Sequence, residues 1–449
     1  MNHGVSLIGG WLPLVIELLA VIAVLAALGR RSRRWWFGWL PVCLVLGAAA
    51  ALVVRTWVNS EGLASDPAPG QLWWWIGLFG ATVMLAVVGW RGIHWPRRAL
   101  SVLAIPLTLL AVLVSLNKWV GYFPTVPAAW NALTAGPLPD EIDIDDLAAV
   151  RNTHPTTGKL VEVSISDNAS GFKHRDEYVY LPPVWFAGEA PPALPVVLMI
   201  AGEFNTPADW MRSGNAIAAI DDYARAHQGR TPIFVFADSG GSFNNDTECV
   251  NGTRGAAADH LTKEVRPFVI DRFGASSDPA AWAVVGWSMG GTCAIDLTVM
   301  HPDLFRTFVD IAGDHGPTAG TKEQTIERLY GGDAQQWSAF DPANVMAAHG
   351  PYDHVAGLFD EATGTFKPPS NFSPPPQSDT ALGFGGHDVW TDDDRTDASA
   401  DLCHSATAVG IECTVHSSTS GHTWQFAGQS FADALPWLSA RLAAAAPIK

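Results

Sequence analysis

The amino-acid sequence predicts two parts: an α-helical membrane bundle of four spans, then an α/β domain with a mainly parallel sheet and helices on both faces. Residues 1–119 contain four long apolar runs and hold nine Lys/Arg against three Asp/Glu. The remaining residues hold 18 Lys/Arg against 41 Asp/Glu, and short apolar segments alternate there with helical ones. We therefore expect a transmembrane domain over 1–118, a linker over 119–157 and a globular domain over 158–449.

Each apolar run is long enough for a helix to cross the roughly 30 Å hydrocarbon core of a bilayer. The first and third connecting loops, 29–34 and 91–98, carry four and three Arg, whereas 55–71 carries one Arg and two acids. Because basic loops stay in the cytoplasm, we expect a multi-pass plasma-membrane protein whose C-terminal domain is extracytoplasmic. A cleaved signal peptide is the competing interpretation, but residues 1–7 lack the basic segment that it needs. The runs are Leu7–Leu28, Trp35–Val54, Leu72–Trp90 and Ala99–Leu116.

Glu17 is the one charged residue inside these runs. It is either a proton-binding or substrate-binding group within the bundle, or a neutral acid hydrogen-bonded to a neighbouring helix. We favour the second interpretation because a single acid makes no relay.

Strands and helices alternate in the globular part. Lys159–Ser166 alternates apolar and polar residues like a half-buried strand, with Tyr178–Leu181 as its candidate hairpin partner. Pro195–Ala201 and Ile233–Asp238 are continuous apolar runs, typical of strands buried on both faces. Gly364–Thr380 is expected to be a surface loop. Further strands are expected at Trp282–Val285, Ala381–Gly386 and Ile411–Ser417, and helices at Ala208–His227, Ala256–Phe273, Thr292–Met300 and Gln429–Leu442.

The segment from Gly286 to Gly290 reads GWSMG, between a predicted strand and a predicted helix. In this G-x-S-x-G arrangement the glycines let strand and helix approach closely, and the tight turn exposes the serine hydroxyl above the sheet edge. Ser288 is therefore the candidate nucleophile. The backbone N–H of Met289, at the helix N-terminus, is a candidate oxyanion donor.

A serine nucleophile needs a base and an orienting acid, which in this architecture follow it in the order acid, then His. Asp388 follows the predicted strand 381–386 and is the candidate acid, whereas Asp392, Asp393 and Asp394 are better explained as caps of the next helix. His422 follows the last predicted strand and is the candidate base. The weighed alternatives are His301 at a helix end, His416 on a strand, and His315 and His387 as lining residues.

The loop after the first central strand should provide a second oxyanion donor, for which the backbone N–H of Glu203 is the candidate. The Glu203 side chain either contacts the substrate or is solvated. We predict that Phe204, Trp287 and Trp424 line the substrate site.

Four of the five cysteines fall in the part expected outside the cell, where disulfides persist. Four cysteines allow three pairings. The local choice is Cys403 with Cys413, which leaves Cys249 with Cys293, while Cys43 is a small apolar residue within the second run. No Cys-x-x-Cys or His-rich cluster is present in the sequence, so we predict neither a metal nor a cofactor.

Several segments resemble the esterase D-type α/β-hydrolases. They are GWSMGG followed by HPDLF, GGDAQQWSAFDP at Gly331–Pro342, and GHTW…LPWL at Gly421–Leu438. Within that group the chain resembles the actinobacterial antigen 85-type mycolyltransferases and esterases over roughly Gly158–Leu442. The resemblance implies an α/β-hydrolase fold, a triad at Ser288, Asp388 and His422, and oxyanion donors at Glu203 and Met289. The antigen 85 group uses Glu as its acid and has no four-helix anchor, so the resemblance favours a generic esterase or acyltransferase over trehalose mycolylation.

Two functions follow from these features. The first is a membrane-anchored, outward-facing serine esterase or acyltransferase that acts on an acyl ester, such as an envelope lipid or glycan, through an acyl-enzyme. The alternative is a non-catalytic, hydrolase-like ligand-binding or sensor domain on a membrane bundle. Binding to nucleic acid is not expected, because the net charge of −17 would repel phosphates.

Overall fold

The computed structural model describes residues 5–28, 32–33, 35–61, 68–90, 94–120, 122–123, 125–134, 138–242, 245–363 and 394–445. The chain divides into two compact units, one built mainly from residues 1–135 and the other from residue 136 onward.

Among its described residues the first unit holds four helices that are long and apolar enough to cross a membrane. Small residues allow two of them to approach closely: a side chain at Gly47 on α2 would collide with the carbonyl oxygen of Gly77 on α3. The helices are α1 (Trp11–Leu28), α2 (Leu40–Glu61), which the π-helical turn η1 (Trp35–Trp39) precedes, α3 (Gly70–Val88) and α4 (Trp95–Val120); the short α5 (Val126–Leu133) follows.

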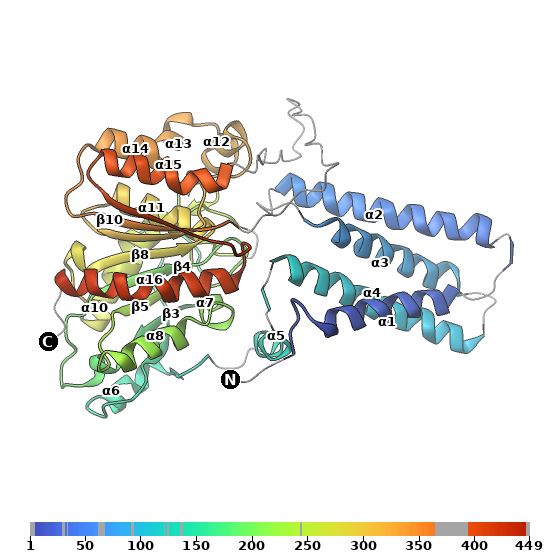
Figure 1. Ribbon diagram of the computed structural model, residues 1–449, viewed down its shortest axis with the longest axis horizontal. Coiled ribbons are helices and arrows are strands. Elements are labelled where there is room, and N and C mark those ends of the chain that lie inside the picture. The colour runs from blue at the N-terminus through green and yellow to red at the C-terminus, as the bar shows by residue number, and fades with distance from the viewer. Residues whose placement is uncertain are drawn as a thin grey trace. The chain divides into compact units, whose positions relative to one another are not determined.

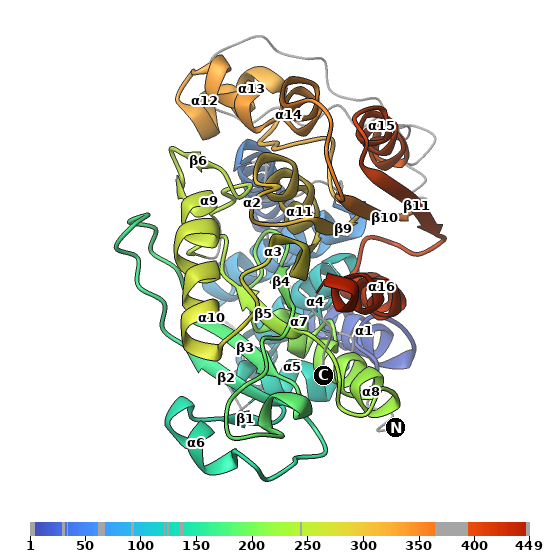
Figure 2. The ribbon, with the colours of Figure 1, turned by 90° about the vertical axis from the view of Figure 1, so that its left-hand side faces the viewer.

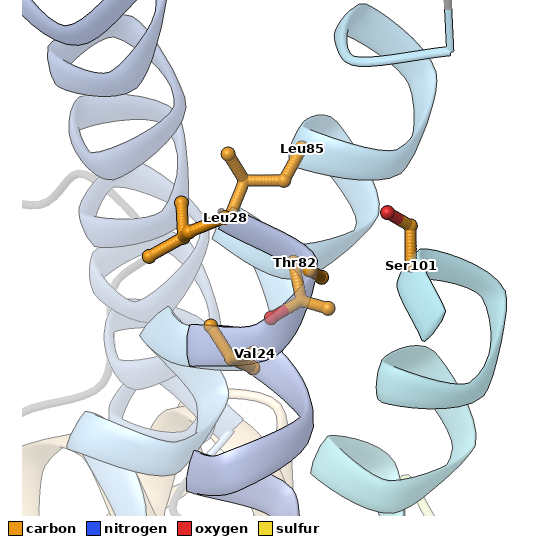
Figure 3. Close-up of a pocket in the computed structure, with 6 residues that line it drawn as sticks. Val24, Leu28, Thr82, Leu85 and Ser101 are labelled. Atoms are coloured by element: carbon orange, nitrogen blue, oxygen red, sulfur yellow. The ribbon is translucent and has the colours of Figure 1, made fainter. Parts of the chain in front are cut away.

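A small pocket lies between α1, α3 and α4 (Figure 3). Its two hydroxyl groups are engaged by their own helices, since Thr82 Oγ1 donates to the carbonyl oxygen of Leu78 and Ser101 Oγ donates to that of Arg97. The pocket therefore presents a mainly apolar lining, formed by Val24, Ala27, Leu28, Thr82, Leu85 and Ser101.

Glu17 contacts two neighbouring helices of the bundle. Gln71 Nε2 donates to Glu17 Oε1 over 3.0 Å, and Lys118 Nζ lies 3.4 Å from the same oxygen. The hydrogen bond to a neighbouring helix agrees with the favoured interpretation, but the lysine makes the contact an ion pair as well. Together the three side chains connect α1 with α3 and α4.

In the part of the second unit that the structure describes, nine strands form one sheet in the order β1-β2-β3-β5-β4-β8-β9-β10-β11. The six strands from β5 to β11 in that order are mutually parallel, whereas β3 is antiparallel to both of its neighbours. This confirms the predicted fold class. The strands are β1 (Glu141–Ile142), β2 (Lys159–Val163), β3 (Glu177–Leu181), β4 (Val196–Ile200), β5 (Ile233–Ala237), β8 (Trp282–Trp287), β9 (Thr307–Ile311), β10 (Ala356–Ala362) and β11 (Glu412–Ser418), and β6 (Asn251–Gly252) pairs with β7 (Gly255–Ala256) in a separate ribbon.

Helices cover both faces of this sheet, α8 and α16 on one and α10 and α11 on the other (Figures 1 and 2). Every residue of β4 and β5 is buried, as their continuous apolar runs predict, and every residue of β8 and β9 is buried as well. The helices are α6 (Leu147–Val150), α7 (Asp209–Arg212), α8 (Ala216–Ala226), α9 (Ala257–Asp259), α10 (Arg266–Phe273), α11 (Met289–Met300), α12 (Lys322–Tyr330), α13 (Ala334–Phe340), α14 (Pro342–His349), α15 (Asp394–Ala408) and α16 (Trp424–Ala445), and the π-helical turn η4 (His260–Val265) joins α9 to α10.

The structure differs from the sequence prediction in several elements. β9 and β10 were not predicted, and β1 falls inside the expected linker but pairs with β2. The single helix predicted over 208–227 is two helices, α7 and α8, separated at Asn215, whose φ is +54°. The expected strand 381–386 and the expected loop 364–380 lie outside the described residues.

The strand order reverses at β4, near the centre of the sheet, which makes this position a topological switch point. The chain proceeds from β4 to β5 on one side and later returns to β8 on the other side of β4. In open α/β sheets, ligands bind at the carboxyl ends of the strands where the order reverses in this way. Ser288 follows β8 and Glu203 follows β4, so both lie at this point.

Candidate active site

Ser288 lies on a sharp turn between β8 and α11. Its backbone adopts φ +59° and ψ −126°, a conformation that side-chain-bearing residues rarely take. The flanking glycines make the turn possible, because a side chain at Gly286 would collide with the carbonyl group of Gly290, and one at Gly290 with the carbonyl oxygen of Ile200. The predicted steric basis of the G-x-S-x-G segment is therefore present.

His422 lies on the loop between β11 and α16, which brings it beside Ser288 from 134 residues away. Its Nε2 is 3.0 Å from Ser288 Oγ, within hydrogen-bond distance for proton transfer. The ring of Trp287 packs at a centroid distance of 5.2 Å against the imidazole. The two side chains that the sequence singled out as nucleophile and base are thus in contact.

Asp388, the candidate acid, lies outside the described residues. It follows β10 in the chain, and β10 is parallel to its neighbours β9 and β11. The chain therefore leaves β10 at the same edge of the sheet as the loops that carry Ser288 and His422. The role of Asp388 stays a prediction.

The loop after β4 packs directly against the candidate nucleophile. A side-chain carbon built on Gly202 would lie 3.1 Å from Ser288 Cβ. Glu203 comes next, and Phe204 then takes a strained φ of +64°. Met289 opens the 12-residue helix α11, whose dipole favours negative charge at this end. The two candidate oxyanion donors thus flank Ser288 on its two neighbouring segments.

The Glu203 side chain is half-buried. Burial, then the negative charge of Asp246, raises the pKa of the Glu203 carboxyl well above its usual range, against the opposing effect of Arg254. Of the two possibilities weighed for this side chain, free solvation does not fit these surroundings.

The candidate substrate residues differ in their exposure. Phe204 is half-buried, whereas Trp287 is 4% and Trp424 0% exposed. The two indoles contact each other at a centroid distance of 4.5 Å, and Trp210 packs edge-on against Trp424. In this conformation the tryptophans support the His422 loop, and their contact with substrate stays a prediction.

The Cys249–Cys293 disulfide ties α11 to the segment before β6. Cys293 lies on the helix that begins directly after Ser288 and is fully buried. The second disulfide joins Cys403 on α15 to Cys413 on β11, and Cys43 is a buried cysteine that takes part in neither disulfide. Both predicted pairings are confirmed.

One group of metal-ligating residue types gathers among the described residues, formed by His174, Glu177 and His260. The two imidazole rings stack at 4.4 Å and 20°, so their in-plane lone pairs do not converge on one ion. Burial alone would lower the pKa of His260, but hydrogen bonds to the carboxylates of Glu177 and Glu264 outweigh burial and raise it. The arrangement suits a buried charge cluster better than a metal site.

Comparison with known proteins identifies the family. Residues 173–438, more than half of the chain, match the family described as Esterase. The chain belongs to this esterase family. The esterase is accordingly a serine hydrolase of the carboxylic ester hydrolase class.

The individual proteins that resemble this esterase share less than 30% sequence identity with it. An uncharacterized protein of Corynebacterium glutamicum is 26% identical over 449 residues, covering 96% of each chain. Among solved structures, an S-formylglutathione hydrolase from Agrobacterium tumefaciens is 18% identical with a TM-score of 0.47, over 64% of this chain and 97% of that one. MPT51 (FbpC1) of Mycobacterium tuberculosis is 15% identical with a TM-score of 0.41, over 62% and 99%.

Two further features of the site carried no recognisable sequence signal. Asn205 bridges the Glu203 loop and Trp424 through its side chain. Arg175 pairs with Asp238 at the end of β5 and also reaches the Asn205 carbonyl. Neither Asn205 nor Arg175 belongs to a motif with a characteristic spacing, so these contacts can be recognised only in the folded chain.

Proposed function

We propose that the protein is a membrane-anchored, outward-facing serine esterase or acyltransferase that acts on acyl esters of cell-envelope lipids or glycans. The single observation that carries the proposal is the 3.0 Å contact between Ser288 Oγ and His422 Nε2 on a strained turn. Family membership supports the ester substrate.

In the first half-reaction His422 accepts the proton of Ser288 as the serine oxygen bonds to the ester carbonyl carbon. The N–H groups of Glu203 and Met289 stabilise the resulting oxyanion. When the tetrahedral intermediate collapses, the alcohol leaves with the proton from His422 and an acyl-enzyme remains. Asp388 holds the imidazole in the required tautomer.

In the second half-reaction His422 takes a proton from water or from an acceptor hydroxyl, which attacks the acyl carbon. Collapse then breaks the acyl–serine bond and returns the proton to Ser288. Hydrolysis and acyl transfer therefore share all steps except the identity of the acceptor.

The outward orientation rests on two independent supports. The arginine-rich loops 29–34 and 91–98 favour the cytoplasmic side, which puts the chain after α4 on the opposite side. The two disulfides of the α/β unit are typical of an oxidising compartment. A C-terminal alkaline phosphatase fusion should be active and a green fluorescent protein fusion dark; the reverse pattern would overturn the orientation.

Activity is tested on the full-length protein in detergent micelles, with p-nitrophenyl esters and a fluorophosphonate probe. Ser288→Ala should abolish labelling and lower turnover by up to about 10⁶-fold. Ser277→Ala, an exposed serine near the opposite end of β8, is the matched control and should retain both. Wild-type protein that neither labels nor hydrolyses any ester would instead favour the non-catalytic sensor.

The substrate class is tested by mass spectrometry of protein purified from its native membrane. A His422→Ala variant should retain an acyl group on Ser288 if deacylation is slowed more than acylation. The mass of this acyl group would identify the acyl chain of the donor. In a separate reaction with added polyol, an acylated polyol would indicate acyl transfer and a free fatty acid would indicate hydrolysis. A variant that carries only short cytosolic acyl groups would refute the envelope substrate.

A further inference from the structure

We propose that Asn205 is a positioning residue that holds the oxyanion loop and the His422 loop in register with Ser288. The inference rests on the function proposed above. In this role Asn205 does not contact the substrate. It positions the loops whose groups make that contact.

All four polar groups of Asn205 are engaged, and the residue is only 9% exposed. Its side-chain Nδ2 donates to the carbonyl oxygen of Glu203 over 2.7 Å, and its Oδ1 accepts from Trp424 Nε1 over 3.0 Å. Its backbone N–H donates to the Gly202 carbonyl over 3.2 Å, and its own carbonyl accepts from Arg175 Nη2 over 2.8 Å. An indole nitrogen can only donate, so Trp424 fixes which side-chain atom of Asn205 is the oxygen.

These contacts clamp both peptide groups that flank Glu203. The N–H of Glu203 and the carbonyl of Gly202 belong to one planar, trans peptide and point in opposite directions. The backbone bond from Asn205 to Gly202 therefore sets the direction of the candidate oxyanion donor. The side-chain bond to the Glu203 carbonyl fixes the next peptide in the same way.

The clamp counteracts local strain. Phe204, between the two clamped peptides and Asn205, has a φ of +64°, and a non-glycine residue in this region costs on the order of 1–3 kcal/mol unless its surroundings enforce it. Without the asparagine side chain the peptide between Glu203 and Phe204 loses the bond from Asn205 Nδ2. The loop would then relax, and the N–H of Glu203 would turn away from Ser288.

At its other end Asn205 contacts Trp424, in the segment that carries the candidate base. Trp424 opens α16 two residues after His422, is completely buried, and contacts Trp287, the residue before Ser288. The bond between Asn205 and Trp424 spans 219 residues of sequence and connects the loops after β4 and β11. One side chain thus links the segments that carry the oxyanion donor and the base.

An ion pair between half-buried Arg175 and buried Asp238 supports the clamp. Arg175 reaches the Asn205 carbonyl while its guanidinium and backbone N–H bind the Asp238 carboxylate. Burial alone would raise the pKa of Asp238, but the hydrogen bonds and charge of Arg175 hold it below its usual value. The charged pair therefore persists, and it anchors Asn205 to the end of β5.

Two substitutions test the proposal in the full-length protein. Asn205→Asp keeps the size and an acceptor for Trp424 but places an oxygen against the Glu203 carbonyl. Trp424→Phe removes the indole N–H and keeps an aromatic ring. Asn344→Asp, the same exchange at an exposed position of α14, is the matched control.

Because removal or displacement of an oxyanion donor costs about 10²–10³ in rate, we expect Asn205→Asp to lower kcat for a p-nitrophenyl ester about 10–100-fold, with KM within about two-fold. Affinity for a boronic acid that mimics the tetrahedral intermediate should fall by the same factor as kcat. Trp424→Phe should show the same pattern, about 3–10-fold, and Asn344→Asp should match wild type.

The outcomes are distinct. Parallel losses of kcat and boronate affinity at constant KM support positioning, and if Asn205→Asp does not fold, Trp424→Phe alone carries the test. Wild-type kcat and boronate affinity in the folded variants, or a lower melting temperature with both kinetic quantities unchanged, would overturn it. Wild-type protein without esterase activity or fluorophosphonate labelling would refute the proposed function instead.

Discussion

Removal of the Cys249–Cys293 disulfide is the perturbation whose size follows most directly from the structure. The bond closes a loop with a sequence separation of 44, for which the chain-entropy relation gives about 4 kcal/mol. The Cys403–Cys413 bond, with a separation of 10, gives about 3 kcal/mol by the same relation. For a domain of this size each kcal/mol shifts the melting temperature by about 2–4 °C. The Cys249→Ala/Cys293→Ala variant should therefore melt about 8–16 °C below wild type.

The assay is a tryptophan-fluorescence melt of the full-length protein in detergent, without reductant, with Cys403→Ala/Cys413→Ala as the comparison. Replacing both cysteines of a pair avoids a new unpaired thiol. The first variant should be the less stable of the two, and its esterase activity should also fall, because Cys293 lies on the helix that begins after Ser288. In denatured wild type one thiol, Cys43, should react with a thiol reagent. Three or more reactive thiols, or a melting-temperature shift below 2 °C, would refute the reasoning.

The remaining predictions concern the nucleophile turn and pH. Gly290→Ala should cost at least ten-fold in activity because its methyl group would overlap a backbone carbonyl of β4, whereas Gly421→Ala, whose nearest contact is 3.9 Å away, should stay within two-fold in the same assay. Burial raises the pKa of Asp310 to about 7, so the folded protein favours the protonated form of this carboxyl. The stabilisation that this preference gives is complete below about pH 4 and is lost as the pH rises through 7. Asp310→Asn should thus flatten the melting temperature measured between pH 4 and 8, and the exposed Asp271→Asn should leave that slope unchanged. Because the pKa of Glu203 is raised, kcat of wild type should decline as this carboxyl ionises, and Glu203→Gln should remove that decline; an identical decline in both would contradict the assignment.

The parts of the site that the sequence predicted depend on local geometry. The turn at Ser288 needs glycine two residues before and after it, a requirement contained within five positions. His422 was found from chain order, since the base follows the last strand in this architecture. Both signals are independent of how the rest of the chain packs.

The parts that were missed depend on tertiary context. β9 and β10 carry acids among their apolar residues, such as Asp310, Asp360 and Glu361, which interrupt the apolar pattern that marks a buried strand. Asn205 is one asparagine in a loop, and its partner Trp424 lies 219 residues away. Periodicity and motif spacing describe neighbours in the chain, so they cannot find a contact of this kind.

The carboxyl at Glu203 fits the proposed chemistry in only one of its two forms. An ionised carboxylate on the residue that carries the candidate oxyanion donor would oppose the developing negative charge and so lower the rate. Burial and the negative charge of Asp246 both raise the pKa of Glu203, because both make the ionised form less favourable. Asp246 is itself buried, and its own pKa is raised to about 6. The neighbouring acid that would add to the repulsion of the transition state therefore also shifts Glu203 toward its protonated form, which places no negative charge beside the candidate oxyanion donor.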